Sequence, residues 1–167
     1  MEIIELPVER WREYRELRLT ALRSDPIAFG STYEQSVGYP EEFWRGRLAS
    51  PSNIILFAER GRRLVGTAAA IVGDEGDAAT AQIVGVFVAP DERGQGIGRC
   101  LLEALLARLA ERDEIARVRL GVTETQEAAI ALYRSLGFEV VGRLEGEIRR
   151  GDRTYDELVM ERMARAG

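Results

Sequence analysis

Two kinds of hydrophobic pattern alternate along the chain and predict its secondary structure. In four segments apolar residues recur at the spacing of one helix face, most clearly after Gly98, where leucines line one side. In the other segments apolar residues alternate with polar ones or form short runs bounded by glycine and proline, as in β-strands. We expect helices at 7–24, 40–48, 98–112 and 126–136, and strands at 2–6, 53–58, 63–72, 81–88, 116–122, 138–148 and 154–163.

Residues that punctuate the pattern predict where several elements begin and end. Residues 123–125 (Thr-Glu-Thr) are expected to cap the helix that begins at Gln126, and Gly137 is expected to close it. No internal repeat, linker or low-complexity tract divides the chain, so we expect residues 1–167 to form a single domain with a mixed α/β sheet. Turns are expected at 60–62, 73–77 and 149–153, and a loop rich in small, polar and aromatic residues at 28–38.

Composition and charge narrow the class of protein. The chain is 46% apolar and 31% charged, with no apolar run near the ~18–20 residues of a membrane span. The N-terminus lacks the basic flank and apolar core of a signal peptide, and the one cysteine excludes an intrachain disulfide framework. We therefore expect a cytoplasmic protein with no membrane partner. The net charge of −5 argues against nucleic acid as a partner and is compatible with a cationic substrate.

The absence of histidine is the most restrictive feature of the composition. It excludes Ser-His-Asp and Cys-His catalysis, the HExxH zinc motif and most other metal sites, so no metal is expected. Cys100 stands in the first turn of a predicted helix, where the helix dipole favours a thiolate. Without a histidine partner, we expect it to be a small core residue.

The segment 84–106 combines a strand, a glycine-rich loop and the start of a helix, and we expect it to bind an anion. In such a succession the unpaired amides and the positive end of the helix dipole point the same way. Glycines let the backbone approach a phosphate closely. A Walker A loop needs Lys-Ser/Thr after its last glycine, and a dinucleotide fingerprint needs a third glycine at position 99. The chain has Arg99 and Cys100 at these places, which excludes both.

Two motifs resemble one known family. Arg93, Gly96 and Gly98 after V-F-V-A-P form the pattern Arg-x-x-Gly-x-Gly, which resembles motif A of the GNAT superfamily of acyl-CoA-dependent N-acetyltransferases. Residues 126–138 (QEAAIALYRSLGF) resemble the helix N-x-x-A-x-x-L-Y-x-x-x-G-F of that family, and residues 155–160 resemble its last strand. The resemblance implies a central, mostly antiparallel sheet with a splayed parallel strand pair, flanked by about four helices.

The resemblance also implies a binding site for acetyl-CoA as co-substrate. The loop amides would hold the pyrophosphate, Arg93 and Arg99 would add positive charge, and the strand backbone near 86–88 would pair with the pantetheine arm. Gln126 replaces the asparagine common at that helix start and can still hydrogen-bond the pantetheine. The implied binding residues are Val86, Phe87, Val88, Arg93, Gly94, Gln95, Gly96, Ile97, Gly98, Arg99, Gln126 and Tyr133.

Acetyl transfer to an amine needs a neutral amine, an oxyanion donor and a proton for the departing thiolate. The resemblance assigns the proton to Tyr133 and the oxyanion donor to a backbone amide at the end of the motif A strand. Gln82 stands where many relatives have a glutamate; its amide can position a water but cannot accept a proton. Glu34 and Glu124 are alternative bases, and a relayed water is the default.

The acceptor is expected to lie against a loop and the hairpin around Gly151, because specificity usually resides in loops. The expected contacts, whose carboxylate and aromatic groups suit a small primary amine, are Phe29, Ser31, Tyr33 and Glu34. The sequence thus predicts direct acetyl transfer from acetyl-CoA to a small-molecule amine in a ternary complex. A protein N-terminal or lysine acetyltransferase and a non-catalytic acyl-CoA-binding sensor remain open, as does a homodimer.

Overall fold

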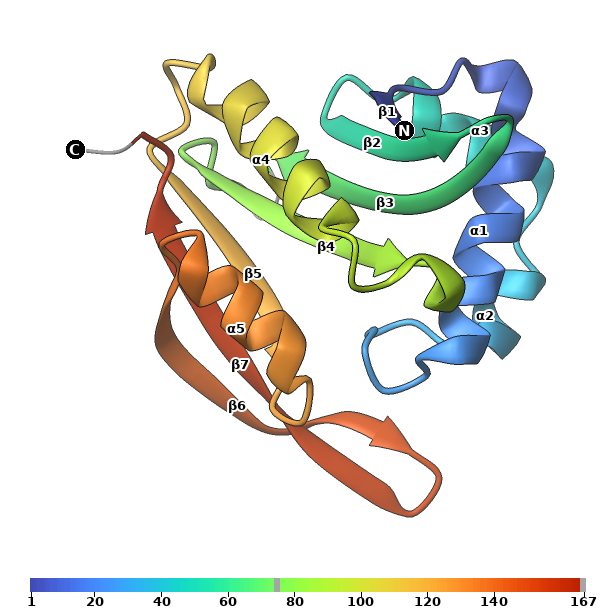
Figure 1. Ribbon diagram of the computed structural model, residues 1–167. Coiled ribbons are helices and arrows are strands. Elements are labelled where there is room, and N and C mark those ends of the chain that lie inside the picture. The colour runs from blue at the N-terminus through green and yellow to red at the C-terminus, as the bar shows by residue number, and fades with distance from the viewer. Residues whose placement is uncertain (74–75, 166–167) are drawn as a thin grey trace.

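Seven strands form one sheet in the order β1-β2-β3-β4-β5-β7-β6, in a computed structural model that describes residues 1–73 and 76–165 (Figure 1). Every neighbouring pair is antiparallel except β4 and β5, which run parallel. This confirms the predicted mixed sheet with one parallel pair. The strands are β1 (Glu2–Ile4), β2 (Asn53–Arg60), β3 (Arg63–Val72), β4 (Thr80–Val88), β5 (Arg117–Thr123), β6 (Glu139–Arg150) and β7 (Arg153–Met163).

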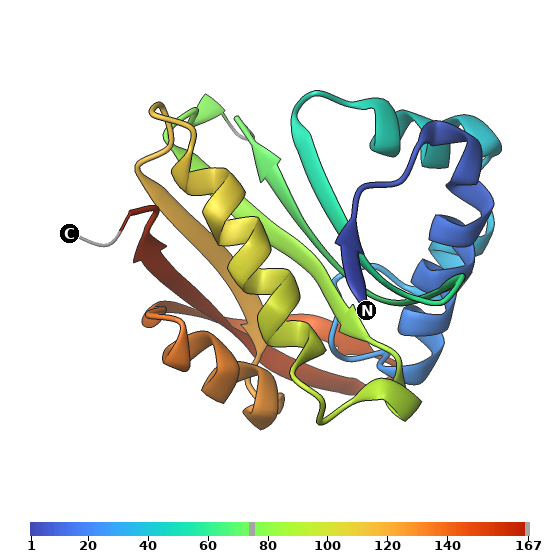
Figure 2. The same cartoon turned by 45° about the horizontal axis from the view of Figure 1, so that its top comes forward.

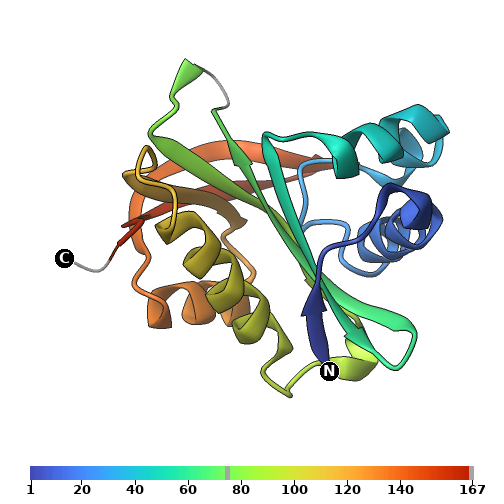
Figure 3. The ribbon, with the colours of Figure 1, turned by 90° about the horizontal axis from the view of Figure 1, so that it is seen from above.

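Helices cover both faces of the sheet. Figure 3 shows the three helices that precede β2 on one face and the two later helices on the other, and Figure 2 shows the longer of the two later helices lying along the sheet. The α-helices are α1 (Trp11–Ser24), α2 (Tyr33–Val37), α3 (Glu41–Ala49), α4 (Ile97–Ala110) and α5 (Glu127–Ser135), and short 3₁₀ turns are η1 (Val8–Arg10) and η3 (Pro90–Glu92).

The described residues contain five α-helices, one more than the four expected, because α2 lies inside the predicted loop 28–38. A capping box starts this helix: the Gln35 amide donates to Thr32 Oγ1 at 3.2 Å, and the Thr32 amide donates to Gln35 Oε1 at 3.0 Å. The Thr-x-x-Gln spacing that makes this box is visible in the sequence. The small and polar residues around it predicted a loop, so this short helix was missed.

Each face of the sheet carries its own apolar core. On one face the leucines of α4, including the fully buried Leu101, Leu102 and Leu105, pack against β2 to β5. On the other face α1 and α3 pack through aromatic rings, and Tyr14 meets Trp44 edge-on with ring centroids 5.4 Å apart. The helical spacing of apolar residues therefore predicted the buried face of α4 correctly.

The parallel pair separates halfway along its length. Pairing of β4 with β5 runs from Thr80 opposite Arg117 to Ile83 opposite Leu120 and stops there, whereas β4 stays paired with β3 as far as Val88. The register of β3 and β4 shifts near Gly85, whose φ of +63° is left-handed and favours glycine. The two strands diverge beyond this point (Figure 1), which confirms the predicted splay and leaves backbone groups of β4 without a β5 partner.

Two local predictions are wrong. Thr123 does not cap α5: it is the last residue of β5, and its hydroxyl donates to the carbonyl of Ile27, while Gln126 occupies the N-cap without a side-chain hydrogen bond. Cys100 is exposed and not a core residue, because its neighbours Leu101 and Leu102 take the inward positions of the helix.

Two other predicted boundaries, the end of α5 and the turn between β6 and β7, are confirmed. Gly137 follows α5 with a φ of +92°, as a closing glycine does, and the hairpin turn between β6 and β7 lies where expected. Of the predicted turn 73–77, residues 74 and 75 lie outside the described residues. In the part of the chain that the structure describes, no helix has the length and apolar character needed to cross a membrane.

Candidate active site

A cavity of about 460 Å³ lies where β4 and β5 separate. This volume is within the usual range of small-molecule sites. Its walls include residues 84–88 of β4, residues 92–94 and 96–99 of the glycine loop and α4, residues 120–122 of β5, and the first two turns of α5. The strand, the loop and the helix singled out in the sequence therefore meet at one site.

The glycine loop presents open backbone to this cavity. Gly94 and Gly96 have φ values of +80° and +81°, and a Cβ at either position would meet nothing within 4 Å. Gly96 is the N-cap of α4, and Ile97, only 3% exposed, anchors the helix in the core. Free amides of the first helical turn stand beside an unfilled space, which is the arrangement that suits a phosphate.

The two arginines of the loop line the cavity but already have partners. Arg93 donates from Nε to the Val88 carbonyl at 2.9 Å and from Nη2 to Asp25 Oδ2 at 2.6 Å. Arg99 donates from Nη2 to Ser135 Oγ at 2.6 Å and remains partly exposed. Both guanidinium groups keep their positive charge within reach of an anion at the loop.

The other expected cofactor contacts divide in two groups. Gln95 does not line the cavity, and its side-chain oxygen accepts a hydrogen bond from Arg60 at 3.2 Å. The remaining expected residues, namely Val86, Phe87, Val88, Gly94, Gly96, Ile97, Gly98, Gln126 and Tyr133, all line the cavity together with Arg93 and Arg99.

Tyr133 projects from α5 into the wall of the cavity. It is 6% exposed, and its ring meets Phe138 edge-on with centroids 6.1 Å apart. Its hydroxyl forms no hydrogen bond within residues 1–73 and 76–165. Burial raises the pKa of the Tyr133 phenol to about 12. The phenol is therefore protonated at neutral pH and is available as a hydrogen-bond donor.

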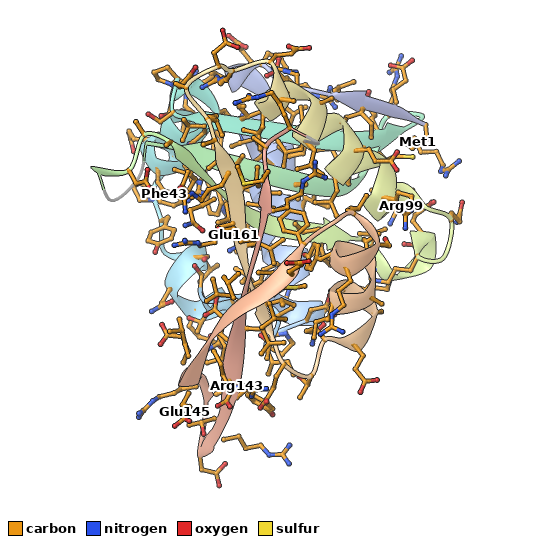
Figure 4. All side chains as sticks on the ribbon, turned by 90° about the vertical axis from the view of Figure 1, so that its left-hand side faces the viewer. Met1, Phe43, Arg99, Arg143, Glu145 and Glu161 are labelled. Atoms are coloured by element: carbon orange, nitrogen blue, oxygen red, sulfur yellow. The ribbon has the colours of Figure 1, made fainter. Side chains whose placement is uncertain are left out.

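The carboxylates and the amide considered as bases do not line the cavity. Gln82 is half-buried in β4 between Ile71 and Arg119, and Glu34 is exposed on α2. Glu124 forms an ion pair with Arg143 at 2.8 Å and accepts the Asp156 amide at 3.2 Å. Arg143 lies on the outer part of the β6–β7 hairpin, away from Arg99 (Figure 4). The structure thus leaves the base to be found elsewhere.

Of the four expected acceptor contacts, Phe29 alone lines the cavity, where its ring packs against Phe87 with centroids 6.5 Å apart. Ser31 does not line the cavity, and its carbonyl accepts a hydrogen bond from Arg150 at 3.2 Å. The Tyr33 ring lies under the guanidinium of Arg23, whose Cζ is 5.0 Å from the ring centroid. Residues 31, 33 and 34 therefore lie outside the cavity walls.

Sequence reasoning missed the residues that hold this loop in place. Arg150, at the end of β6, donates to the carbonyls of Pro26, Phe29 and Ser31, and Thr123 donates to that of Ile27. These contacts hold residues 26–31 in place, and Ala28 and Phe29 of this segment line the cavity. No spacing in the sequence signals them, since they join segments more than 90 residues apart.

Sequence reasoning also missed a carboxylate that lies against one residue of the cavity wall. Glu157 of β7 lies over Gly121 of β5, which lines the cavity; the Glu157 Cδ is 2.7 Å from where a Gly121 Cβ would stand. Burial raises the pKa of the Glu157 carboxyl, and the nearby Glu147 adds to the rise. The glycine at position 121 was visible in the sequence. That Glu157 of the neighbouring strand β7 lies over it was not.

Comparison with known proteins identifies relatives. Residues 11–138 match the Acetyltransferase (GNAT) family. Over 70 residues, 42% of this chain and 43% of the relative, the chain is 44% identical to the [Ribosomal protein bS18]-alanine N-acetyltransferase of Escherichia coli. Over 84 residues, 48% of this chain and 28% of the relative, it is 42% identical to the mycothiol acetyltransferase of Thermobispora bispora. The aligned parts thus span less than half of either relative.

A solved structure shows the same fold along the whole chain. The yncA protein of Salmonella typhimurium, solved with its cofactor acetyl-CoA, superposes with a TM-score of 0.81 at 21% identity, and the match covers 100% of this chain and 95% of that one. The family match spans most of the chain and includes the splayed strands, the glycine loop and α5. The chain belongs to the Acetyltransferase (GNAT) family.

Proposed function

We propose that this protein transfers the acetyl group of acetyl-CoA to the primary amine of a small molecule, by direct attack in a ternary complex. The observation that carries the proposal is the cavity at the β4–β5 splay, which is lined by the glycine loop, by the part of β4 that lacks a β5 partner and by Tyr133. The acetyl-CoA named with the yncA protein supports the same donor here.

The site fits such a donor in two ways. The open space before Gly94 and Gly96 suits the pyrophosphate, because charge-assisted hydrogen bonds to free amides are stronger than neutral ones. Beyond Ile83 the β4 backbone no longer pairs with β5. An extended pantetheine arm takes the place of β5 there by strand-like pairing with β4.

Bound acetyl-CoA supplies an activated thioester carbonyl. A backbone amide near Val88 donates to its oxygen as negative charge develops there. The Tyr133 phenol faces the sulfur; with a pKa raised to about 12 by burial, it is a weaker acid than a thiol of pKa about 8.5. Full proton transfer to the thiolate is therefore uphill, and Tyr133 acts by a hydrogen bond that strengthens as the sulfur gains charge.

A small acceptor is favoured by the closed loop at residues 26–31. Arg150 and Thr123 hold its carbonyls, so the acceptor side of the cavity is bordered by fixed backbone and by the buried Phe29 ring. Transfer to a protein N-terminus is the second candidate, favoured by the name of the Escherichia coli relative. The cytoplasmic location and the homodimer expected from the sequence stay predictions.

Thiol release from acetyl-CoA, measured over amines, amino acids and peptides, tests the proposal. We expect turnover on small amines, whereas turnover on peptides alone would show that the acceptor is a protein or peptide. Tight acetyl-CoA binding without turnover on any acceptor would favour a sensor domain. Tyr133→Phe should lower kcat by roughly 10-fold or more with little change in acetyl-CoA affinity, because it removes one donor that acts in the transition state. An unchanged kcat would remove Tyr133 from the mechanism.

A further inference from the structure

Arg18 brings an uncompensated positive charge to the acceptor side of the cavity. Its guanidinium lies over the Phe29 ring, with Cζ 4.8 Å from the centroid, and its Nη1 is 3.8 Å from where a Gly85 Cβ would stand. Phe29 and Gly85 both line the cavity. In the described part of the chain, Arg18 forms neither a hydrogen bond nor an ion pair, unlike the paired Arg93 and Arg99.

The surroundings of Arg18 suit an anion. The Phe29 ring covers one face of the guanidinium but accepts none of its N–H donors. The titratable neighbours are Tyr14 and Arg47; burial lowers the pKa of the Arg18 guanidinium, and Arg47 adds to this by repulsion. An arginine stays protonated all the same, so the charge lacks a counter-ion and its donors remain free for a ligand.

Glu157 brings the opposite charge to the same opening. It is half-buried on β7 and covers Gly121, where any larger residue would collide with it. Within residues 1–73 and 76–165 it forms no ion pair, and the like-charged Glu147 lies close enough to repel it. Burial and Glu147 raise the pKa of this carboxyl, which marks it as a better proton acceptor than a solvated glutamate.

The two groups lie on the same face of the sheet, each against a glycine that lines the cavity. Gly121 lies between Leu120 and Val122, which both face the core under α4, so strand alternation turns position 121 to the other face. Gly85 faces Arg18 of α1, which packs on that other face. Gly121 directly follows the last β4–β5 pair, and Gly85 lies two residues beyond it on β4. The two glycines thus border the opening opposite the α4 side.

We propose that the acceptor is a zwitterionic small molecule of the α-amino-acid type, whose anionic group binds Arg18 and whose amine is held and deprotonated by Glu157. This inference rests on the proposed acetyl transfer. It names the acceptor and a base. Arg18 and Glu157 lie directly behind Gly85 and Gly121, two residues of the cavity wall that have no side chain, whereas Gln82 and Glu34 have no such position.

The reaction balances with these groups. Of the three ammonium protons, one passes to the Glu157 carboxylate and then to solvent, and one stays on nitrogen in the product amide. The amine lone pair forms the C–N bond to the acetyl carbon as the C–S bond breaks. The third proton ends on sulfur, which leaves as the thiol, so one proton is released for each acetyl group transferred.

Matched pairs of amino acids and their carboxamides test the anion site, since each pair differs by one negative charge. With wild-type protein and acetyl-CoA, we expect kcat/KM roughly 10- to 150-fold higher for the free acids, the span of a hydrogen bond to a charged group. Arg18→Met should remove this preference by raising KM for the acids alone. Arg23→Met is the matched control: it is on the same helix and stacks on Tyr33, outside the cavity walls, and should keep the preference.

Glu157→Gln tests the base. It should lower kcat by roughly 10²- to 10⁴-fold on every acceptor, with the KM for acetyl-CoA unchanged. Thermal unfolding and acetyl-CoA titration of each variant confirm that it is folded.

The inference would be overturned by equal use of acids and amides by the wild type, by a preference that survives Arg18→Met, or by full activity of Glu157→Gln. The wild-type comparison stands even where a variant fails to fold. Turnover restricted to amides or peptides would overturn this inference and leave acetyl transfer intact. Binding of acetyl-CoA with no turnover on any amine would overturn the proposed function itself.

Discussion

The Arg93 guanidinium donates from Nη2 to Asp25 Oδ2 at 2.6 Å, which ties the end of α1 to the glycine loop across 68 positions of the chain. The same side chain donates from Nε to the Val88 carbonyl at 2.9 Å. Both members of the ion pair line the cavity. A carboxylate therefore stands beside the loop that we assign to phosphate, and it offsets part of the charge of Arg93.

Asp25→Asn should lower the KM for acetyl-CoA, by roughly 2- to 5-fold, because it removes a negative charge and keeps the shape and the acceptor oxygen. The gain should shrink as salt is added. Stability should change by less than about 1 kcal/mol, since the pair is partly exposed. Asp91→Asn, which breaks the exposed pair with Arg63, is the control and should leave the KM unchanged. A higher KM in Asp25→Asn would show that the carboxylate mainly positions Arg93.

Gly96→Ala should weaken acetyl-CoA binding, because its methyl group enters the open space before α4 and its φ of +81° becomes strained. Gly61→Ala has the same kind of strain, at a φ of +65° with open space around it, in the turn between β2 and β3. Each variant should lose about 1–2 kcal/mol of stability. Isothermal titration should show reduced affinity in Gly96→Ala alone, and equal affinities would rule out the phosphate assignment.

The free energy of unfolding should fall in alkaline solution through Tyr133. Its pKa is raised from 10.0 to about 12 in the folded protein, so the folded state holds a proton that the unfolded chain releases. The stability linked to this proton is complete below about pH 10 and lost as the pH rises toward about 12, up to about 3 kcal/mol. Denaturant titrations of wild type and Tyr133→Phe should diverge over that interval. Parallel curves would contradict the burial of an ionisable phenol.

Arg150→Met should raise the KM for the acceptor by roughly 10-fold or more and leave the KM for acetyl-CoA unchanged. The variant frees the carbonyls of Pro26, Phe29 and Ser31, so the loop that borders the acceptor side is displaced. Arg149→Met, at the exposed neighbouring position, is the control. A rise in the KM for acetyl-CoA instead would place this loop on the donor side.

Much of the fold followed from local pattern. The helical spacing of leucines after Gly98 predicted the buried face of α4, and alternation predicted β5 with Leu120 and Val122 inward. The missed helix α2 and the wrong cap at Thr123 have one cause. Polar residues at a segment end serve caps, turns or long-range bonds equally well, and the choice depends on what packs beside them.

The sequence by itself determined the strands, the helices, the glycine loop and, through two motifs in register, the family. These depend on spacing within a few residues, which the chain carries wherever it folds. The tertiary structure decided which side chains share the cavity. The end of β4–β5 pairing, the bulge at Gly85 and the pairing of β5 with β7 place Arg18 against Gly85 and Glu157 against Gly121, two glycines that line the cavity. Such register arises from packing across the whole sheet, so no local pattern predicts it.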